Sequence, residues 1–176
     1  KNGTATYTIS GGAEYCKGQK RNPVSIDITS NDGPWTLVYN DGKSDFTQSI
    51  AIGALPFEIL NPNEGIYTVK QITNKDNCVA MGDATKSTTV TIHDTTIATI
   101  TGLPATLCDN GKPINLAFTP ALAAGETATI SSTTGGVSGT QFNPSQAGGA
   151  GIKTLVITYT NANSCVSQNK ATVSIL

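Results

Sequence analysis

The sequence has little charge and little of several functional residue types. Charged residues make up 13% of its 176 residues, the formal net charge is −1, and there is one histidine, one methionine and one tryptophan. Globular domains usually carry about 25% charged residues, so Thr, Ser, Asn and Gly must cover much of this surface. Disordered chains combine low hydrophobicity with high net charge, and this balance argues against them. A neutral surface rich in hydroxyls and amides is typical of extracellular β-proteins.

The sequence also lacks a basic stripe and a long apolar run. With a net charge of −1 there is no positive surface to hold a phosphate backbone, so no nucleic-acid partner is expected. No apolar run approaches the ~20 residues that a membrane-spanning helix needs, so no membrane insertion is expected. The chain begins with Lys1 and has no signal peptide, and we interpret it as a mature or excised piece of a longer protein.

Catalytic patterns are missing as well. His93 is the one histidine, and a catalytic triad or a histidine-based zinc site needs a partnered histidine. It stands beside Asp94 between two strand-like stretches, so we assign it to a domain junction. No serine lies in a Gly-x-Ser-x-Gly elbow. The glutamates are scattered and form no pair suited to glycoside hydrolysis: Glu14, Glu58, Glu64 and Glu126. We therefore predict that the chain is not an enzyme.

Oxygen-bearing side chains in predicted loops leave a calcium site open as an alternative. Calcium takes about six to eight oxygen ligands. The candidates are Asn31, Asp32, Gly33, Asp41, Asp45, Asp76, Asp109, Asn110 and Gly111. No segment has the ligand spacing of an EF-hand loop, and these residue types also form turns. We therefore predict no cofactor, with calcium as the alternative.

What the sequence does contain is an internal repeat, which predicts that one structural unit occurs twice. Each copy has a β-type stretch leading through glycine to an early cysteine, then a Gly-Ile-x-Thr stretch leading to a late cysteine, then an alternating strand. In order, these segments are 5–11, Cys16, 65–69, 73–79 and 88–92 in the first copy, and 98–102, Cys108, 151–155, 160–166 and 171–175 in the second. We place the boundary at His93-Asp94-Thr95, which gives domains 1–94 and 95–176. The very short linker predicts limited flexibility between them.

Four cysteines fit two disulfides in an oxidising compartment. Zinc is the competing interpretation, but no CxxC motif is present and His93 is distant in sequence from every cysteine. Each repeat holds an early and a late cysteine, so the simplest of the three possible pairings is Cys16–Cys78 and Cys108–Cys165. In the chain-entropy model each such bridge stabilises its domain by about 4 kcal/mol. The cysteines fall at strand ends or in loops, so we expect each bridge to clamp an edge or an end of its domain.

Strand signals are frequent, and no window has convincing helical periodicity. Residues 24–29 alternate strictly, with Val24, Ile26 and Ile28 on one face. Predicted strands in the first half are 5–9, 24–29, 35–40, 46–51, 57–60, 66–73 and 87–92. In the second half they are 97–101, 113–118, 126–131, 140–142, 152–160 and 170–175. Short strands at this density predict an all-β fold of two tandem immunoglobulin-like β-sandwich domains, each with one disulfide.

Two local features refine this fold prediction. Trp35 opens a predicted strand in the position of a sandwich-core tryptophan, so we assign it a structural role. The Asp41-Gly42 dipeptide favours a hairpin turn, because both residues tolerate a positive φ. The loops that could carry ligand-binding residues are 30–34, 41–45 and 132–139.

The order and spacing of the motifs resemble a known family. In repeat one the matching segments are Cys16-Lys17-Gly18, Gly33-Pro34-Trp35-Thr36-Leu37-Val38-Tyr39, Gly65-Ile66-Tyr67-Thr68 and Cys78. In repeat two they are Phe142-Asn143-Pro144-Ser145-Gln146-Ala147-Gly148, Gly151, Ile157-Thr158-Tyr159 and Cys165. The chain resembles the Ig-like or PKD-like repeats of large Bacteroidetes surface and secreted proteins. These include the gliding-motility adhesin SprB and many multidomain proteins exported by type IX secretion.

This resemblance implies an extracellular or cell-surface location and a role in adhesion, motility or scaffolding. It predicts a structural stalk module whose partners are neighbouring repeats of the same polypeptide. Two alternatives stay open: a module that binds surface glycans or proteins through its loops, and an accessory domain of a secreted hydrolase. The family supplies no ligand-binding residues. Lys153 stands where repeat one has Tyr67, which departs from the pattern.

Overall fold

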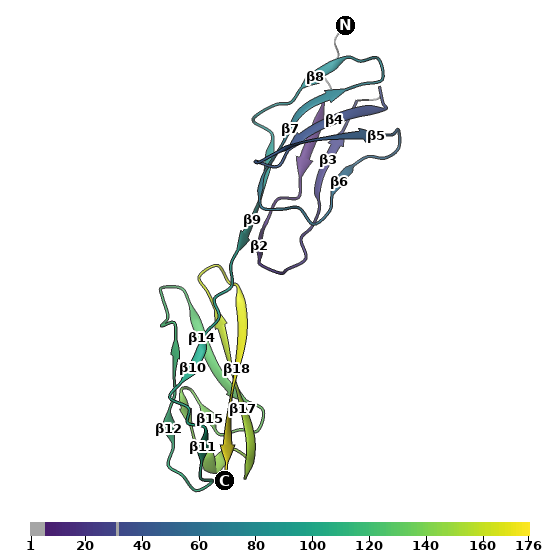
Figure 1. Ribbon diagram of the computed structural model, residues 1–176. Coiled ribbons are helices and arrows are strands. Elements are labelled where there is room, and N and C mark those ends of the chain that lie inside the picture. Colours follow the sequence, from purple (N-terminus) through teal and green to yellow (C-terminus); the bar gives the residue numbers. More distant parts are fainter. Residues whose placement is uncertain (1–5, 31) are drawn as a thin grey trace. The chain divides into compact units, whose positions relative to one another are not determined.

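Alternating apolar and polar residues build an all-β chain with one short 3₁₀ helix (Figure 1). The computed structural model describes residues 6–30 and 32–176. The chain divides into two units, Lys1–His93 and Asp94–Leu176. The division falls one residue before the predicted boundary, so Asp94 belongs to the second unit. Two positions named above, Ala5 of the first predicted strand and Asn31 of the calcium candidates, lie outside the described residues.

The first unit packs two sheets face to face. One sheet has the order β1-β3-β6, and the other has the order β2-β9-β7-β4-β5 with β8 beside the end of β7. The strands are β1 (Tyr7–Ser10), β2 (Glu14–Cys16), β3 (Val24–Ile28), β4 (Trp35–Asn40), β5 (Asp45–Ile50), β6 (Phe57–Ile59), β7 (Gly65–Thr73), β8 (Val79–Met81) and β9 (Ser87–His93). All pairs are antiparallel except β2 with β9.

The predicted core of the first unit is confirmed. Val24, Ile26 and Ile28 are buried on one face of β3. Trp35 is also buried, and its indole Nε1 donates a hydrogen bond to Asp32 Oδ1 at 3.3 Å. Fully burying one such aliphatic side chain contributes about 1.5–3 kcal/mol. The tryptophan is therefore part of the core, as the sequence predicts.

The Asp41-Gly42 hairpin is present with a four-residue loop. Asn40 pairs with Asp45, so residues 41–44 form the turn between β4 and β5. Asp41 Oδ1 accepts hydrogen bonds from the amides of Lys43 and Ser44 at 2.9 and 2.8 Å. Gly42 has φ +92°, a conformation that a side chain would strain. The dipeptide therefore supplies both the carboxylate acceptor and the positive φ.

The second unit is again built from antiparallel strands with one parallel pair. Its longest sheet has the order β11-β18-β17-β14, and its other strands form the groups β10-β13 and β12-β16-β15. The elements are β10 (Thr99–Thr101), β11 (Thr106–Leu107), β12 (Ile114–Asn115), β13 (Ala117–Thr119), β14 (Thr127–Ser132), β15 (Val137–Ser138), β16 (Gln141–Phe142), η1 (Pro144–Gln146), β17 (Gly151–Thr160) and β18 (Val166–Ile175). Phe142, Leu155, Ile157, Tyr159 and Val173 lie at the centre of its core.

Most predicted strands match the observed ones to within about two residues, but β18 begins four residues before its predicted start, and the strand predicted at 113–118 is divided into β12 and β13. Four short strands were not predicted: β2, β8, β11 and β15. Each has only two or three residues, too few for alternation to reveal. Three of them adjoin a cysteine, which matters for the disulfide prediction below. Among the residues described, no helix is long and apolar enough to span a membrane.

Candidate functional site

The first feature that both units share is a parallel strand pair at one end. In the first unit β2 runs parallel to β9, with Cys16 beside His93. In the second unit β11 runs parallel to β18, with Leu107 beside Ile175. The first strand of each sandwich switches from one sheet to the other in order to reach this position. We call these two strand pairs the parallel clamps.

Backbone hydrogen bonds extend each clamp past its strands. In the first unit the amide of Lys17 donates to the carbonyl of His93 at 2.8 Å. In the second unit the amides of Ser174, Leu176 and Asp109 donate to the carbonyls of Ala105, Leu107 and Leu176 at 2.9, 2.9 and 3.1 Å. The segment where the chain enters each unit is therefore fastened directly to the segment where it leaves.

The second shared feature is the turn that carries the late cysteine. In the first unit Asn74 Oδ1 accepts hydrogen bonds from the amides of Asp76 and Cys78 at 3.0 and 2.8 Å. The amide of Asn74 donates to the carbonyl of Cys78 at 3.1 Å, and Asn77 has φ 58°. The asparagine side chain thus closes the turn in place of a backbone partner.

The second unit repeats this turn atom for atom. Asn161 Oδ1 accepts from the amides of Asn163 and Cys165, both at 3.0 Å. The amide of Asn161 donates to the carbonyl of Cys165 at 3.0 Å, and Ser164 has φ 61°. The internal repeat seen in the sequence is therefore also a repeat of local structure, and Cys78 and Cys165 hold equivalent positions.

The early cysteines are equivalent in the same way. Each lies at the end of the first strand of its clamp, Cys16 on β2 and Cys108 directly after β11. The carbonyl of Cys16 accepts from the amide of Gln19 at 3.0 Å, and the carbonyl of Cys108 accepts from the amide of Gly111 at 3.0 Å. Both positions are therefore followed by the same turn.

The predicted disulfide pairing is wrong. Cys16 and Cys165 are disulfide-bonded, but Cys78 and Cys108 are free thiols. Neither Cys16–Cys78 nor Cys108–Cys165 forms, and the expectation of one disulfide within each domain fails with them. The bonded set contains one early and one late cysteine, and so does the free set.

The physical reason is that the early and late cysteines of one unit lie at opposite ends of it. In the second unit Cys165 directly precedes β18, and Cys108 lies beside its far end. The ten residues of β18 span roughly 33 Å. A disulfide requires Cα atoms within about 4.4–6.8 Å, so this pair cannot close.

The first unit has the same geometry. Cys16 lies beside the end of β9, whereas Cys78 lies in the turn after β7. Gly65 pairs with Val90 near the clamp, and β7 then runs away from it to Thr73, a distance of roughly 26 Å. Figure 1 shows β2 and β8 at opposite ends of this unit.

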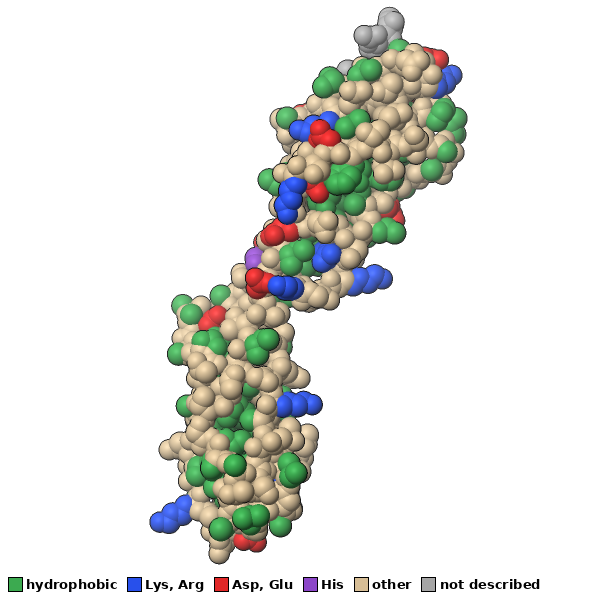
Figure 2. Space-filling view, in the orientation of Figure 1, with side chains coloured by type: hydrophobic (Ala, Val, Ile, Leu, Met, Phe, Trp, Pro, Cys, Tyr) green, Lys and Arg blue, Asp and Glu red, His purple; other side chains and the backbone are tan. Residues whose placement is uncertain are grey.

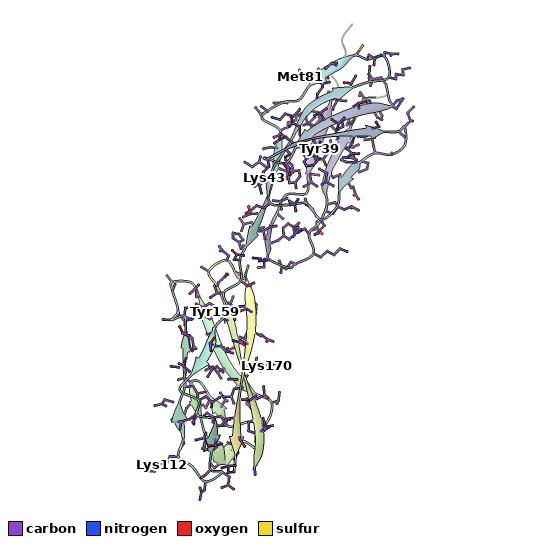
Figure 3. The ribbon with its side chains drawn as sticks, viewed as in Figure 1. Tyr39, Lys43, Met81, Lys112, Tyr159 and Lys170 are labelled. Carbon is purple, nitrogen blue, oxygen red and sulfur yellow. The ribbon has the colours of Figure 1, made fainter. Side chains whose placement is uncertain are left out.

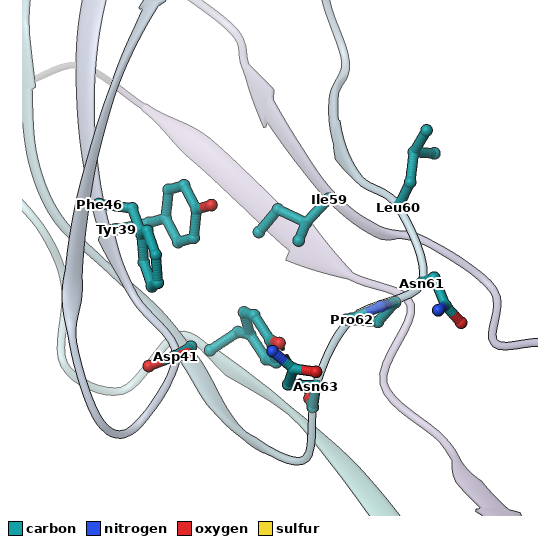
Figure 4. A pocket seen from close by; sticks show the side chains of 9 residues that line it. Tyr39, Asp41, Phe46, Ile59, Leu60, Asn61, Pro62 and Asn63 are labelled. Atoms are coloured by element: carbon teal, nitrogen blue, oxygen red, sulfur yellow. Dashed lines mark hydrogen bonds between the residues drawn. The ribbon is translucent and has the colours of Figure 1, made fainter. Parts of the chain in front are cut away.

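A third feature, which lies in the first unit, is an aromatic hollow of about 150 Å³ (Figure 4). It is lined by Tyr39, Asp41, Phe46, Ile59, Leu60, Asn61, Pro62, Asn63 and Tyr67. Tyr39 and Phe46 stack with ring centroids 5.2 Å apart. Phe46 is 38% exposed, whereas Tyr39 and Tyr67 are buried. The hollow therefore offers one accessible aromatic face.

Charge and burial set the protonation of the hollow. Hydrogen bonds from the amides of Ser44 and Lys43 lower the pKa of Asp41 below its usual value. Burial raises the pKa of Tyr39 and of Tyr67, and the charge of Asp41 raises both further. Tyr67 Oη donates to the carbonyl of Asn63 at 2.9 Å. At neutral pH the hollow thus presents one carboxylate and two neutral phenols.

The two predicted ligand-binding loops of the first unit are not brought together. Loops 30–34 and 41–45 flank β4 and lie at its opposite ends. Loop 132–139 belongs to the second unit. Of these loops, 41–45 supplies Asp41 to the aromatic hollow. The sequence missed Phe46 and Ile59 as lining residues, since both read as ordinary strand residues.

Three of the calcium candidates, Asp32, Asp41 and Asp45, accept hydrogen bonds from neighbouring groups. Asp32 accepts from Trp35 Nε1 and from Asn74 Nδ2, and the hydrogen bond from Asn74 is the main cause that lowers its pKa. Asp45 Oδ1 accepts from Asn40 Nδ2 at 2.7 Å. In the part of the chain that the structure covers, no group of three or more His, Cys, Asp or Glu side chains could hold a metal ion.

His93 lies at the end of the first clamp. Its Nε2 is 3.2 Å from Glu14 Oε2, so a histidine and a carboxylate of one strand pair face each other. The geometry is that of a surface ion pair whose contribution depends on histidine protonation.

The visible surface carries few charges. Figure 2 shows most of it as neither hydrophobic nor charged, with isolated Lys, Arg, Asp and Glu side chains. This agrees with the 13% of charged residues in the sequence. Single exposed apolar side chains such as Ile52 and Leu60 are scattered over the first unit.

The fold is thus that of immunoglobulin-like β-sandwich domains. No family model matches the chain, and no curated protein matches it. Among solved structures it is similar to a Ca²⁺-stabilized adhesin that helps an Antarctic bacterium reach out and bind ice, with a TM-score of 0.51 and 11% identity. That match covers 100% of this chain and 50% of the adhesin chain.

Two animal structures are also similar. Extracellular domains 3–5 of Drosophila OTK match with a TM-score of 0.40 and 10% identity over 98% of this chain and 64% of that one. Extracellular cadherin domains 1–4 of protocadherin gamma B7 match with a TM-score of 0.29 and 10% identity over 99% of this chain and 50% of that one. The chain therefore spans about half to two thirds of the length of these structures.

Proposed function

We propose that the chain is a spacer module of an extracellular adhesin-type protein, built to withstand tension along its length. The observation that carries this proposal is the parallel clamp, which occurs in both units. The resemblance of the motifs to Ig-like or PKD-like repeats of Bacteroidetes surface proteins supports the same role. Gliding motility and type IX secretion are the settings that this resemblance suggests.

The clamp favours resistance to force for a geometric reason. When tension pulls on a unit, the segment entering it is drawn one way and the segment leaving it is drawn the other way. Because these two segments are parallel neighbours, the hydrogen bonds between them are loaded in shear and must break together. In an antiparallel hairpin pulled at its open end, the bonds break one at a time. A unit with a parallel clamp should therefore unfold at a higher force.

The composition of the described residues supports a structural role. The one histidine contacts a glutamate, and no cluster suited to a metal is present among the residues described. The surface is weakly charged (Figure 2). Neighbouring modules of the same polypeptide are the expected partners, and the distal end of such a protein would carry the adhesive contact.

Single-molecule force spectroscopy in a reducing buffer tests this proposal, because tension then reaches the hydrogen bonds of each clamp and is not carried by a disulfide. Asp109→Pro removes the amide that donates to Leu176, one of the hydrogen bonds of the second clamp. We expect it to lower the unfolding force of the second unit while the first unit keeps its own. Asp109→Ala is the matched control, because it removes the side chain but keeps the amide. Equal unfolding forces in wild type and Asp109→Pro would contradict the proposal.

The aromatic hollow favours a second function, the binding of a carbohydrate or a protein side chain. Phe46 is partly exposed and stacked on Tyr39, and apolar rings beside hydrogen-bonding groups are typical of such sites. A glycan array and a pull-down with wild type and Phe46→Ala test it. Saturable binding lost in Phe46→Ala, but kept in the exposed control Ile52→Ala, would support a binding module instead of a pure spacer.

A further inference from the structure

The two free cysteines occupy positions that are known, from the other unit, to form disulfides. Cys108 is equivalent to Cys16, and Cys78 is equivalent to Cys165, by strand position and by turn hydrogen bonds. Cys16 and Cys165 are disulfide-bonded. Each free cysteine therefore occupies a position whose equivalent in the other unit already forms a disulfide.

The turn that carries the free Cys78 has the same local geometry as the turn that carries the bonded Cys165. The thiol of Cys78 lies 4.0 Å from the carbonyl of Asp76, and the sulfur of Cys165 lies 3.9 Å from the carbonyl of Asn163. In each turn the asparagine Oδ1 accepts a hydrogen bond from the cysteine amide, at 2.8 Å for Cys78 and at 3.0 Å for Cys165. Cys78 thus has the backbone setting of a disulfide cysteine without a partner in this chain.

Cys16 and Cys165 are excluded as partners of the free thiols by distance and by occupancy. Cys78 is roughly 26 Å or more from Cys16, as the length of β7 requires. Cys16 and Cys165 are already bonded. Cys78 is partly exposed and Cys108 is exposed, so both thiols face solvent. In Figure 3, Met81 marks the Cys78 end of the first unit and Lys112 marks the Cys108 end of the second.

We propose that Cys78 of one copy of this module forms a disulfide with Cys108 of another copy, so that copies join head to tail. The pairing is early with late because the bonded set also consists of one early and one late cysteine. The charges near the two thiols allow this contact. Lys75 and Asp76 precede Cys78, and Asp109 and Lys112 follow Cys108, so each end carries one positive and one negative side chain.

The bond forms by thiol–disulfide exchange with oxidised glutathione. The thiolate of Cys78 attacks one glutathione sulfur and releases one glutathione thiolate. The thiolate of Cys108 in another copy then attacks the mixed disulfide and releases the second. One protein disulfide is gained, the glutathione disulfide is reduced to two thiols, and the two cysteine protons end on glutathione. This joining is independent of the proposed spacer role, because it does not involve the clamp hydrogen bonds.

The test mixes two variants that each keep one thiol. Cys108→Ser keeps Cys78, and Cys78→Ser keeps Cys108. In a glutathione redox buffer, wild type should give a ladder of multimers on a non-reducing gel. Each variant alone should stay largely monomeric with little homodimer, and the mixture should give mainly a heterodimer and nothing larger than a dimer. We expect the heterodimer to exceed both homodimers together by about tenfold, a preference of about 1.4 kcal/mol.

Two further results would decide the matter. Peptide mapping of the wild-type ladder should recover the Cys78–Cys108 peptide pair, and Cys78→Ser/Cys108→Ser should remain monomeric. Heterodimer and homodimers in equal total amount, which is the statistical outcome, would overturn the proposal, as would a mixture without cross-linked product. Circular dichroism of each variant establishes that it is folded. A failed ladder with normal unfolding forces would reject this inference and leave the spacer role intact.

Discussion

The two units fill one buried position with side chains of different chemistry. Tyr67 is the third residue of β7 and is 2% exposed, and Lys153 is the third residue of β17 and is 6% exposed. Each sends its polar tip back to a carbonyl of the preceding loop. Tyr67 Oη donates to Asn63 at 2.9 Å, and Lys153 Nζ donates to Gly148 at 3.3 Å. Both units therefore keep the backbone and a loop carbonyl that accepts a hydrogen bond, but different side chains donate to it.

The two cores also differ in the types of side chain that fill them. Seven of the ten aromatic residues precede His93, so the first unit depends more on large rings. The second unit is packed mainly from aliphatic side chains around Phe142 and Tyr159. Figure 3 places Tyr39 within the first unit and Tyr159 within the second. Four experiments can break or sharpen this comparison.

Tyr67→Ala should give the largest effect. It empties a buried ring position and leaves the Asn63 carbonyl without its donor, and should cost the first unit about 3–5 kcal/mol. Lys153→Ala should cost the second unit less, because a lysine stem fills less space and its removal also relieves the burial of a charge. Trp35 fluorescence reports unfolding of the first unit, and hydrogen exchange reports the second. A larger loss for Lys153→Ala would reverse the comparison.

Asn74→Ala and Asn161→Ala should each destabilise their own unit by about 1–2 kcal/mol, because each removes an acceptor for two backbone amides. Chemical denaturation followed by the same two signals measures both losses. The controls are Asp76→Ala and Asn163→Ala, which keep those amides and should change little. If one of the two substitutions leaves the stability of its unit unchanged, the two turns are not energetically equivalent.

The second unit should lose stability in acid through a tyrosine–glutamate contact that has no counterpart among the described residues of the first unit. Tyr159 Oη donates to Glu126 Oε2 at 2.5 Å, and this hydrogen bond lowers the pKa of Glu126 below its ordinary 4.5. Its contribution is present above the pKa of the unfolded chain and disappears as pH falls through the lower folded pKa. Denaturation between neutral pH and pH about 3 should show this slope in wild type. Tyr159→Phe should flatten it.

Modification of the free thiols should have the smallest effect on stability, and it is read out chemically. An alkylating reagent applied without reductant should modify Cys78 and Cys108 and leave both units folded. Cys16 and Cys165 should react only after reduction. Mass spectrometry of the peptides reads out both sets. Alkylation of Cys16 before reduction, or protection of Cys78, would remove the asymmetry between the two copies of each position.

The sequence was sufficient for the strands with clear alternation and for the repeat. Val24 to Ile28 and the strand at 35–40 were predicted within a residue, because each alternates against a single core. Trp35 was correctly assigned to the core. The turn chemistry of Asp41-Gly42 is readable from residue type alone, since it depends on local φ and one carboxylate.

The cysteine pairing could not be read from the sequence, because it depends on the strands that were missed. β2 carries Cys16, β8 follows Cys78 and β11 precedes Cys108. These three strands are too short for periodicity, yet they decide which end of a sandwich each cysteine occupies. The aromatic hollow was missed for a related reason, since Phe46 and Ile59 come together only through the pairing of distant strands.

The glycines between β1 and β2 let one ribbon belong to both sheets, which matters if a protease removes that ribbon. A side chain at Gly12 would place its Cβ 2.4 Å from the carbonyl oxygen of Thr89, so the crossover between sheets is closed to other residues there. The ribbon 7–16 borders β3 in one sheet and β9 in the other. A protease that removed this ribbon would bare two unpaired strand edges at once, and unpaired edges are what neighbouring chains add to during aggregation.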